Sequence, residues 1–332
     1  MYSAGQARWF CAEPRRTFPA SVVERIVDCA LPGSRVVDQR PLSDGLRNAN
    51  FRLQVSPGDE SFVLRVYEHD PSLCQKELDL FRMLEKTVPI PEVIYAEPNG
   101  VEDAPPFTLV RYVEATSLRD VYRGGDADAI AQAAKSVGEV LAAIGRIRFA
   151  KAGWLAPGPS VCEGEPRGPD PIPQFVESCL ASERLQSRVP MDLRDAISNL
   201  MWLWAPRFEG LEDETRLVHG DFGKRNLLMK EIAGVWRVAA VLDWEFAVSG
   251  TPLMDVGHFL CYERPSRRVE PHFSNGYLSA GGVLPEDWRR LARVVDAASL
   301  CESLTHEYLP ENVIPELVEL ARATVENRDP VL

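Results

Sequence analysis

Residues 217–229 have the sequence LVHGDFGKRNLLM, and residues 235–245 have the sequence VWRVAAVLDWE. Apolar residues end the first segment and fill most of the second, so each is expected to contain a strand, and Gly234 falls where a turn between them is needed. The predicted hairpin carries Asp221 and Asn226 on the loop that enters it and Asp243 just beyond its second strand. Two carboxylates and an amide are therefore gathered at one end of the hairpin.

These three groups suit phosphoryl transfer from a nucleotide. One carboxylate can accept or orient the proton of the attacking hydroxyl, and we assign that role to Asp221. The carboxylate of Asp243 and the amide oxygen of Asn226 are hard ligands that would hold Mg²⁺. His219 is expected to support the loop by hydrogen bonds, because Asp221 already fills the place of the base. The alternative is a polar hairpin with a buried histidine and scattered aspartates.

The pattern His-Gly-Asp-x-x-x-x-Asn, followed by Asp-Trp-Glu, resembles that of the aminoglycoside phosphotransferase/choline kinase family, a branch of the protein-kinase-like fold. The resemblance implies an α+β, bilobal fold: a small antiparallel-sheet lobe at 18–112 and a larger, mainly helical lobe at 113–330. It also implies ATP or GTP as co-substrate, with Mg²⁺, between the lobes. The length of 332 residues exceeds what one hydrophobic core usually supports, in agreement with two lobes.

A second group of candidate residues lies in the predicted N-terminal lobe. Gly45 and Asn48 belong to a turn whose backbone N–H groups could bind phosphate, although Asn48 could equally cap the turn. Arg65 lies in the alternating segment 61–67, where the resembled family usually has a lysine that pairs with the phosphates. The resemblance implies that Glu77, on the inward side of the next helix, holds this cation in place.

The resemblance implies two further features. The segment 107–113 would join the lobes, with adenine hydrogen-bonded to backbone near Val110 and Tyr112. Asp255 would accept hydrogen bonds from the catalytic loop, the alternative being an ordinary carboxylate in the first turn of a helix. Independently of the resemblance, the composition of 149–173, rich in Gly and Pro, predicts a long loop that could be a lid or a passive connection.

The acceptor is the least determined part of the prediction. Members of the resembled family phosphorylate hydroxyls of aminoglycosides and other antibiotics, of choline and of other small molecules, and the fold does not choose among them. Contacts from the C-terminal lobe are implied, and Glu263, Glu302 and Glu307 could meet a cationic acceptor or could simply be surface residues. The net charge of −12 would attract a cation, and no basic stripe predicts a nucleic-acid partner.

Apolar periodicity predicts most of the helices. They are expected at 18–30, 127–147, 175–185, 191–204 (ended by Pro206), 270–280, 285–304 and 310–325.

Cysteine usage and hydropathy indicate the cellular compartment. The seven cysteines are scattered without a Cys-x-x-Cys pair, which favours reduced thiols and a cytoplasmic location. No apolar run is long enough for a membrane span, and the N-terminus lacks the pattern of a signal peptide. A monomer or homodimer is expected.

The predicted function is small-molecule O-phosphotransfer to an aminoglycoside-like or other acceptor, an activity that could confer antibiotic resistance. The alternatives are a non-catalytic nucleotide-binding protein of the same fold, a metabolic kinase for a small amino alcohol or sugar, and a metal-dependent hydrolase.

Overall fold

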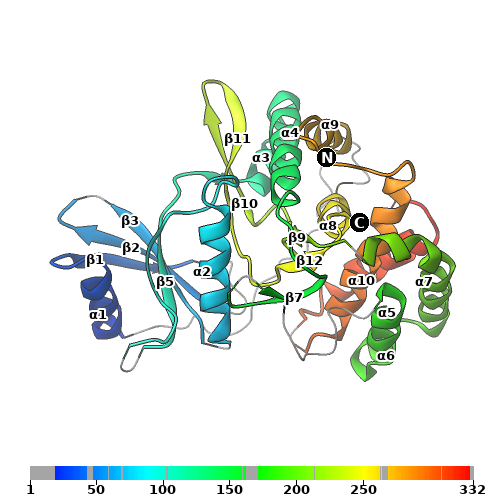
Figure 1. Ribbon diagram of the computed structural model, residues 1–332, viewed down its shortest axis with the longest axis horizontal. Helices are drawn as coiled ribbons and strands as arrows, with labels where there is room; N and C mark the ends of the chain where they lie inside the picture. Colours follow the sequence, from blue (N-terminus) through cyan, green and yellow to red (C-terminus); the bar gives the residue numbers. More distant parts are fainter. Residues whose placement is uncertain are drawn as a thin grey trace.

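An antiparallel sheet in the N-terminal part of the chain faces a larger helical region (Figure 1). The computed structural model describes residues 19–329, apart from 43–47, 59, 69, 102–103, 159, 162–170, 213, 262, 264–267 and 308. Within these residues, no helix is both long and apolar enough to cross a membrane. The arrangement confirms the predicted mixed α+β class.

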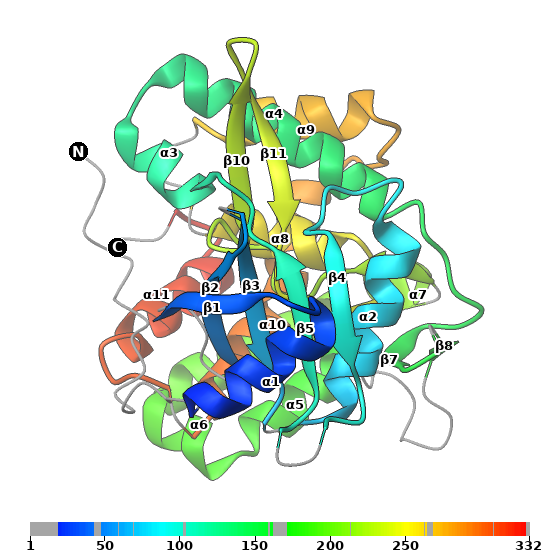
Figure 2. The same ribbon diagram turned by 90° about the vertical axis from the view of Figure 1, so that its left-hand side faces the viewer.

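The N-terminal sheet has five antiparallel strands in the order β1-β2-β3-β5-β4. Their bounds are Arg35–Pro41 (β1), Ala49–Ser56 (β2), Ser61–Val66 (β3), Val93–Glu97 (β4) and Phe107–Arg111 (β5). Helix α1 (Ala20–Ala30) lies across one face of the sheet in Figure 2, and its apolar residues share a core with Phe62, Leu64 and Val66 of β3. Because side chains alternate along a strand, Arg65 lies on the opposite face.

Helix α2 (Ser72–Leu84) packs beside β4 and β5. Asp70 begins this segment, and its carboxylate accepts a hydrogen bond of 3.0 Å from the backbone N–H of Ser72. The apolar side of the helix buries Leu80 and Leu84, and Glu77 is buried with them. A carboxylate in such a position needs a compensating cation or hydrogen-bond donors.

The predicted catalytic hairpin is present as β10 (Leu227–Ile232) and β11 (Val235–Val241), and it is joined by β6 (Thr116–Ser117). A second small sheet has the order β8-β7-β12-β9. Its bounds are Gly153–Ala156 (β7), Ser160–Val161 (β8), Arg216–Val218 (β9) and Val248–Gly250 (β12). Strand β9 enters the loop at 219–226, and β12 follows the Asp-Trp-Glu segment, so the pairing of these two strands brings both ends of the motif together.

The helices of the C-terminal part lie mainly on the side of these two small sheets that is turned away from the N-terminal sheet (Figure 1). They are α3 (Leu118–Gly124), α4 (Ala127–Ile144), α5 (Ile172–Leu180), α6 (Glu183–Arg188), α7 (Met191–Glu212), α8 (Leu253–Cys261), α9 (Glu270–Ser279), α10 (Trp288–Thr305) and α11 (Ile314–Val325). One hydrophobic cluster joins the helical region, and a second joins α1 to the N-terminal sheet. The boundary between 112 and 113 stays a prediction.

Two sequence-based predictions of helices were wrong. The helix expected at 175–185 is two helices, α5 and α6, with Ser182 between them in an extended conformation. Pro206 was expected to end a helix but lies inside α7. Proline within a helix costs about 3 kcal/mol, and Phe208, fully buried two residues later, supplies packing that offsets this cost. The predicted loop at 149–173 contains the short strands β7 and β8, while 162–170 lie outside the described residues.

Candidate active site

The loop at 219–226 is shaped by Gly220 and Asp255. Gly220 has a φ of +83°, and a Cβ there would lie 2.4 Å from the carbonyl oxygen of Phe246, so no other residue fits without a shift of the backbone. The buried carboxylate of Asp255, in the first turn of α8, accepts hydrogen bonds from the backbone N–H groups of His219 (2.7 Å) and Gly220 (3.0 Å). Burial raises the pKa of Asp255, while these two donors and the nearby histidines oppose the rise.

His219 fastens the loop to the end of β11. Its Nδ1 lies 3.2 Å from the backbone nitrogen of Asp221 and accepts that N–H, so the ring proton is on Nε2, which donates to the carbonyl of Leu242 at 2.8 Å. The ring packs on the buried indole of Trp244, with centroids 4.6 Å apart. Both ring nitrogens are occupied, which fits the loop-supporting role expected for His219 and leaves proton transfer to another group.

Asp221 is held from both sides of its carboxylate. Oδ2 accepts a hydrogen bond of 2.8 Å from the side-chain amide of Asn226, and Oδ1 lies 3.2 Å from Nε2 of His258. Burial would raise the pKa of Asp221, but the hydrogen bonds and charge of its neighbours outweigh this and lower the pKa below its usual value. The carboxylate is therefore ionised at neutral pH. The amide nitrogen of Asn226 also donates to the Asp221 carbonyl at 3.0 Å, which leaves its amide oxygen for a cation.

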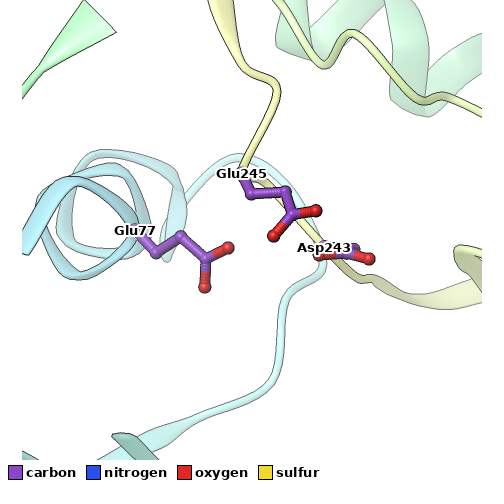
Figure 3. A group of neighbouring side chains, drawn as sticks. All are labelled: Glu77, Asp243 and Glu245. Carbon is purple, nitrogen blue, oxygen red and sulfur yellow. The ribbon is translucent and has the colours of Figure 1, made fainter. Parts of the chain in front are cut away.

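Arg65 joins the N-terminal sheet to the end of the hairpin. Its Nη2 atom lies 3.0 Å from Glu77, 2.6 Å from Asp243 and 3.3 Å from Glu245. These three carboxylates converge from α2 and from the segment after β11 (Figure 3), with ligand oxygens within 4.8 Å of one another. Asp243 has a φ of +66°, an unfavourable conformation for a residue with a side chain, and such strain is common at functional sites.

Further contacts stabilise this cluster of three carboxylates, Glu77, Asp243 and Glu245. The hydroxyl of Tyr67 donates to Glu77 at 2.5 Å, the amide of Asn48 donates to Glu245 at 2.8 Å, and Nζ of Lys76 donates to the carbonyl of Glu245 at 2.7 Å. Asn48 thus contacts Glu245, an arrangement different from both the phosphate contact and the turn cap considered above. Burial raises the pKa of Glu77 and opposes the charge of Arg65, whereas the surrounding carboxylates raise the pKa of Arg65 well above its usual value.

Sequence reasoning did not single out Glu245, Lys76 or His258 as site residues. Glu245 was visible as the last residue of the Asp-Trp-Glu motif, and Lys76 directly precedes Glu77. The sequence signal for His258 is weaker: it lies one helical turn after Asp255. Its contact with Asp221 depends on how α8 packs against the catalytic loop, which the sequence alone does not give.

The remaining candidate residues are spread more widely. Gly45 lies outside the described residues. Val110 and Tyr112 lie at the end of β5, where the backbone N–H of Tyr112 already donates to Ser61 at 3.0 Å. Among the acceptor candidates, Glu263 is buried and lies 2.6 Å from Nζ of Lys224 in the catalytic loop.

The other two acceptor candidates lie beside different helices. Glu307 lies 3.1 Å from Arg184 of α6, and the charge of Glu302 acts on Cys179 of α5. Of the three acceptor candidates, Glu263 is therefore the one shown in contact with the loop.

The site brings together Arg65 of the N-terminal sheet, Glu77 of α2 and the loop that carries Asp221, an arrangement typical of a kinase-like phosphotransferase. The profile of the phosphotransferase enzyme family matches residues 38–294, well over half of the chain, and the chain belongs to this family. This result confirms the predicted family and the kinase-type class of enzyme, whose acceptors are hydroxyl groups.

Solved structures share the fold along nearly the whole chain. The ternary complex of the aminoglycoside phosphotransferase APH(4)-Ia with ADP and hygromycin B has a TM-score of 0.63 at 21% identity, covering 92% of this chain and 98% of that one. The GDP and kanamycin complex of APH(2")-IIia has a TM-score of 0.67 at 16% identity, covering 91% and 98%. The protein-kinase-like fold is thereby confirmed.

Curated relatives are much longer proteins. Acyl-CoA dehydrogenase family member 11 of Gallus gallus is 26% identical over 253 residues, which are 73% of this chain and 30% of that protein. The protein of the same name from Homo sapiens is 40% identical over 77 residues, which are 22% of this chain and 9% of that protein. The chain therefore spans less than a third of the length of the relatives it matches.

Proposed function

We propose that the protein transfers the γ-phosphate of ATP or GTP to a hydroxyl group of a small molecule, with Asp221 as the base or orienting carboxylate. The observation that carries this proposal is the convergence on one nitrogen of Arg65: Glu77 of the N-terminal part and Asp243 of the catalytic segment both contact it. In kinase-like sites, such a cation and its carboxylate partner position the phosphates against the metal-binding aspartate.

The donor atoms fit a magnesium nucleotide. Asp243 and the amide of Asn226 provide the hard oxygen ligands that Mg²⁺ prefers, and the bound ion would neutralise charge on the phosphates. Nε of Arg65 is buried and has no hydrogen-bond partner among the described residues, so the guanidinium keeps a donor that a phosphate oxygen could use. Because the N–H of Tyr112 is occupied, we place the adenine contact in the connecting residues 113–115 that follow.

The acceptor is proposed to bind on the α8 side of the catalytic loop. A pocket of about 340 Å³ there is lined by Leu260, Glu263 and Arg293, among other residues, and Glu263 reaches the loop through Lys224. Hygromycin B and kanamycin are bound by two proteins of this fold. A hydroxylated and cationic molecule of this kind is our first choice of acceptor, with smaller amino alcohols and sugars next.

A non-catalytic nucleotide-binding role is the less favoured alternative. A protein that only binds a nucleotide has no use for an ionised carboxylate held in place beside the metal ligands, yet Asp221 is fixed there by Asn226 and His258. We further propose a cytoplasmic location and the division into lobes at 18–112 and 113–330.

The test is a measurement of ADP and GDP release by the purified protein with Mg²⁺, against a panel of aminoglycosides, other antibiotics, amino alcohols and sugars. We expect one acceptor class to stimulate release, and we expect Asp221→Asn to abolish the stimulation while nucleotide binding persists. Stimulated release that is equally fast in Asp221→Asn would contradict the assignment of Asp221.

A further inference from the structure

His258 lies between two carboxylates, one in the catalytic loop and one in the interior. Its Nε2 is 3.2 Å from Oδ1 of Asp221, and its Nδ1 is 3.7 Å from Oδ1 of Asp296. Asp296 belongs to α10 and is 0% exposed. The imidazole therefore connects the candidate base with a carboxylate that has been removed from solvent.

A close helix crossing creates this arrangement. Gly257 directly precedes His258 on α8, and a Cβ on Gly257 would lie 2.3 Å from the carbonyl oxygen of Ala292 and 2.9 Å from Cβ of Asp296. Only glycine permits α8 and α10 to approach so closely, and this approach places His258 against Asp296 on one side and the loop on the other. The position of His258 therefore depends on the close contact between Gly257 and α10, the helix that carries the buried Asp296.

The charges around the ring decide its protonation. A neutral imidazole donates from one nitrogen only, so one of the two carboxylates would face a lone pair, whereas an imidazolium donates toward both. A buried carboxylate is costly unless a cation lies nearby. Burial would lower the pKa of His258, but the hydrogen bond to Asp221 and the negative charges of Asp221 and Asp296 raise it to about 10. The ring is a cation throughout the physiological range.

We propose that His258 is a positioning residue for the phosphoryl transfer proposed above, and that its ring, anchored by Asp296, holds Oδ1 of Asp221 so that this carboxylate meets the acceptor hydroxyl in a fixed orientation. The effect of His258 on the reaction rate rests on the proposed function. The linkage of Asp296, His258 and Asp221 does not, since it can be tested without any substrate.

The two contacts of Asp221 fix the plane of its carboxylate. Oδ2 is held by Asn226 and Oδ1 by His258, and each oxygen keeps a lone pair for the acceptor hydroxyl. In the transfer, the acceptor oxygen bonds to the γ-phosphorus, the bond from that phosphorus to the bridging oxygen breaks, and the nucleoside diphosphate leaves. The hydroxyl proton passes to Asp221, and His258 keeps its own proton. A neighbouring cation makes Asp221 a weaker base, which suits a late proton transfer in a loose transition state.

Nitrogen NMR of the isotopically labelled full chain tests the linkage directly. Two other titratable groups act on this arrangement in the described part of the chain: Asp255, whose carboxylate feels the charges of His219 and His258, and His219, whose charge also acts on Asp221. Lys224 of the loop is paired with Glu263 at 2.6 Å. At pH 8 we expect both ring nitrogens of His258 to be protonated, and we expect Asp296→Asn to lower the midpoint of the His258 titration by at least about one pH unit. A neutral His258 ring at pH 8 in the unmodified protein would overturn the inference.

Kinetics test the positioning role. Glutamine at position 258 can still donate to Asp221 but carries no charge. We therefore expect His258→Gln to lower kcat by about tenfold or more, with the Kd of the magnesium nucleotide unchanged. We also expect kcat of the unmodified enzyme to fall as the pH approaches about 10, and this fall to be absent in His258→Gln. His272→Gln, at an exposed position of α9, is the matched control and should leave kcat and its pH profile unchanged.

The outcomes separate this inference from the proposed function. An unchanged kcat in His258→Gln, or a loss that follows weaker nucleotide binding, would overturn the positioning role. If no acceptor stimulates the unmodified protein, the proposed function fails, and the NMR result alone then decides whether Asp296, His258 and Asp221 form the charged linkage.

Discussion

Replacing Arg65 by methionine should destabilise the protein strongly, because its guanidinium contacts all three of the converging carboxylates. Methionine keeps the apolar stem of the side chain and removes the charge. Arg65 is 14% exposed at its side chain and Glu77 is 1% exposed, so little solvent screens the group. Removing one partner from a buried ion pair costs about 3–5 kcal/mol, and we expect a loss of this size at pH 8.

The loss of unfolding free energy in Arg65→Met should be smaller at acidic pH. Burial already raises the pKa of Glu77, and without Arg65 it would rise further. A carboxylate whose pKa is higher in the folded state than in the unfolded state takes up a proton when the protein folds at low pH. This proton uptake makes the unfolding free energy of the variant larger at low pH than at pH 8. Arg65→Met should therefore be closer to the unmodified protein at pH 5 than at pH 8.

Arg65→Lys is the matched control. The three carboxylates all contact the single atom Nη2, and a lysine ammonium offers three donors at one point. The substitution also removes Nε, a buried donor without a partner among the described residues. We therefore expect Arg65→Lys to stay within about 1 kcal/mol of the unmodified protein, since one buried hydrogen-bonding group is worth about that much.

Urea unfolding at pH 8 and pH 5, analysed with the same m-value for all variants, measures these differences. A loss below about 1 kcal/mol for Arg65→Met at pH 8 would refute the account of Arg65 as the counter-ion of a buried carboxylate group. Equal losses for Arg65→Met and Arg65→Lys would refute the claim that charge at one point, rather than the forked shape of the guanidinium, is what the site requires.

Three other substitutions test separate parts of the structure. Gly220→Ala should lose about 1–3 kcal/mol in unfolding and most turnover, because a Cβ would lie 2.4 Å from the Phe246 carbonyl; unchanged melting would count against this. Asp243→Ala should lose magnesium-dependent nucleotide binding in calorimetry, and titrations that are identical with and without Mg²⁺ in the unmodified protein would contradict the metal role. The stabilisation that charged His258 contributes should be complete below pH 6.5 and should disappear as the pH rises through about 10. The unfolding free energies of the unmodified protein and of His258→Gln should therefore converge near pH 10. A difference that stays constant with pH would contradict the linkage of His258 to its two carboxylates.

The catalytic loop was predictable because its chemistry is local in the sequence. Asp221 and Asn226 lie five residues apart, and the spacing of the motif alone placed them together. The partnership of Arg65 with Glu77 was predictable from strand and helix periodicity combined with the resemblance, and the structure places the two side chains 3.0 Å apart.

Features that depend on packing between distant elements were not predictable. The linkage of His258 to Asp296 requires α8 and α10 to cross at Gly257, and no periodicity in either helix indicates that crossing. Pro206 was assigned from its local conformational preference, which tertiary packing around Phe208 overrides. Glu302 was chosen for its charge on a helix of the C-terminal part, but the packing of α10 places it beside α5.

The proposed activity is transfer of a phosphoryl group to an acceptor hydroxyl, as opposed to hydrolysis of the nucleotide. The most direct measurement supplies ATP or GTP with a heavy-oxygen label on the terminal phosphate, together with Mg²⁺ and the stimulating acceptor, and follows the label by mass spectrometry. We predict that the labelled phosphoryl group appears on the acceptor, and that Asp221→Asn abolishes its appearance. Label found only in inorganic phosphate would contradict the account and would indicate a metal-dependent hydrolase instead.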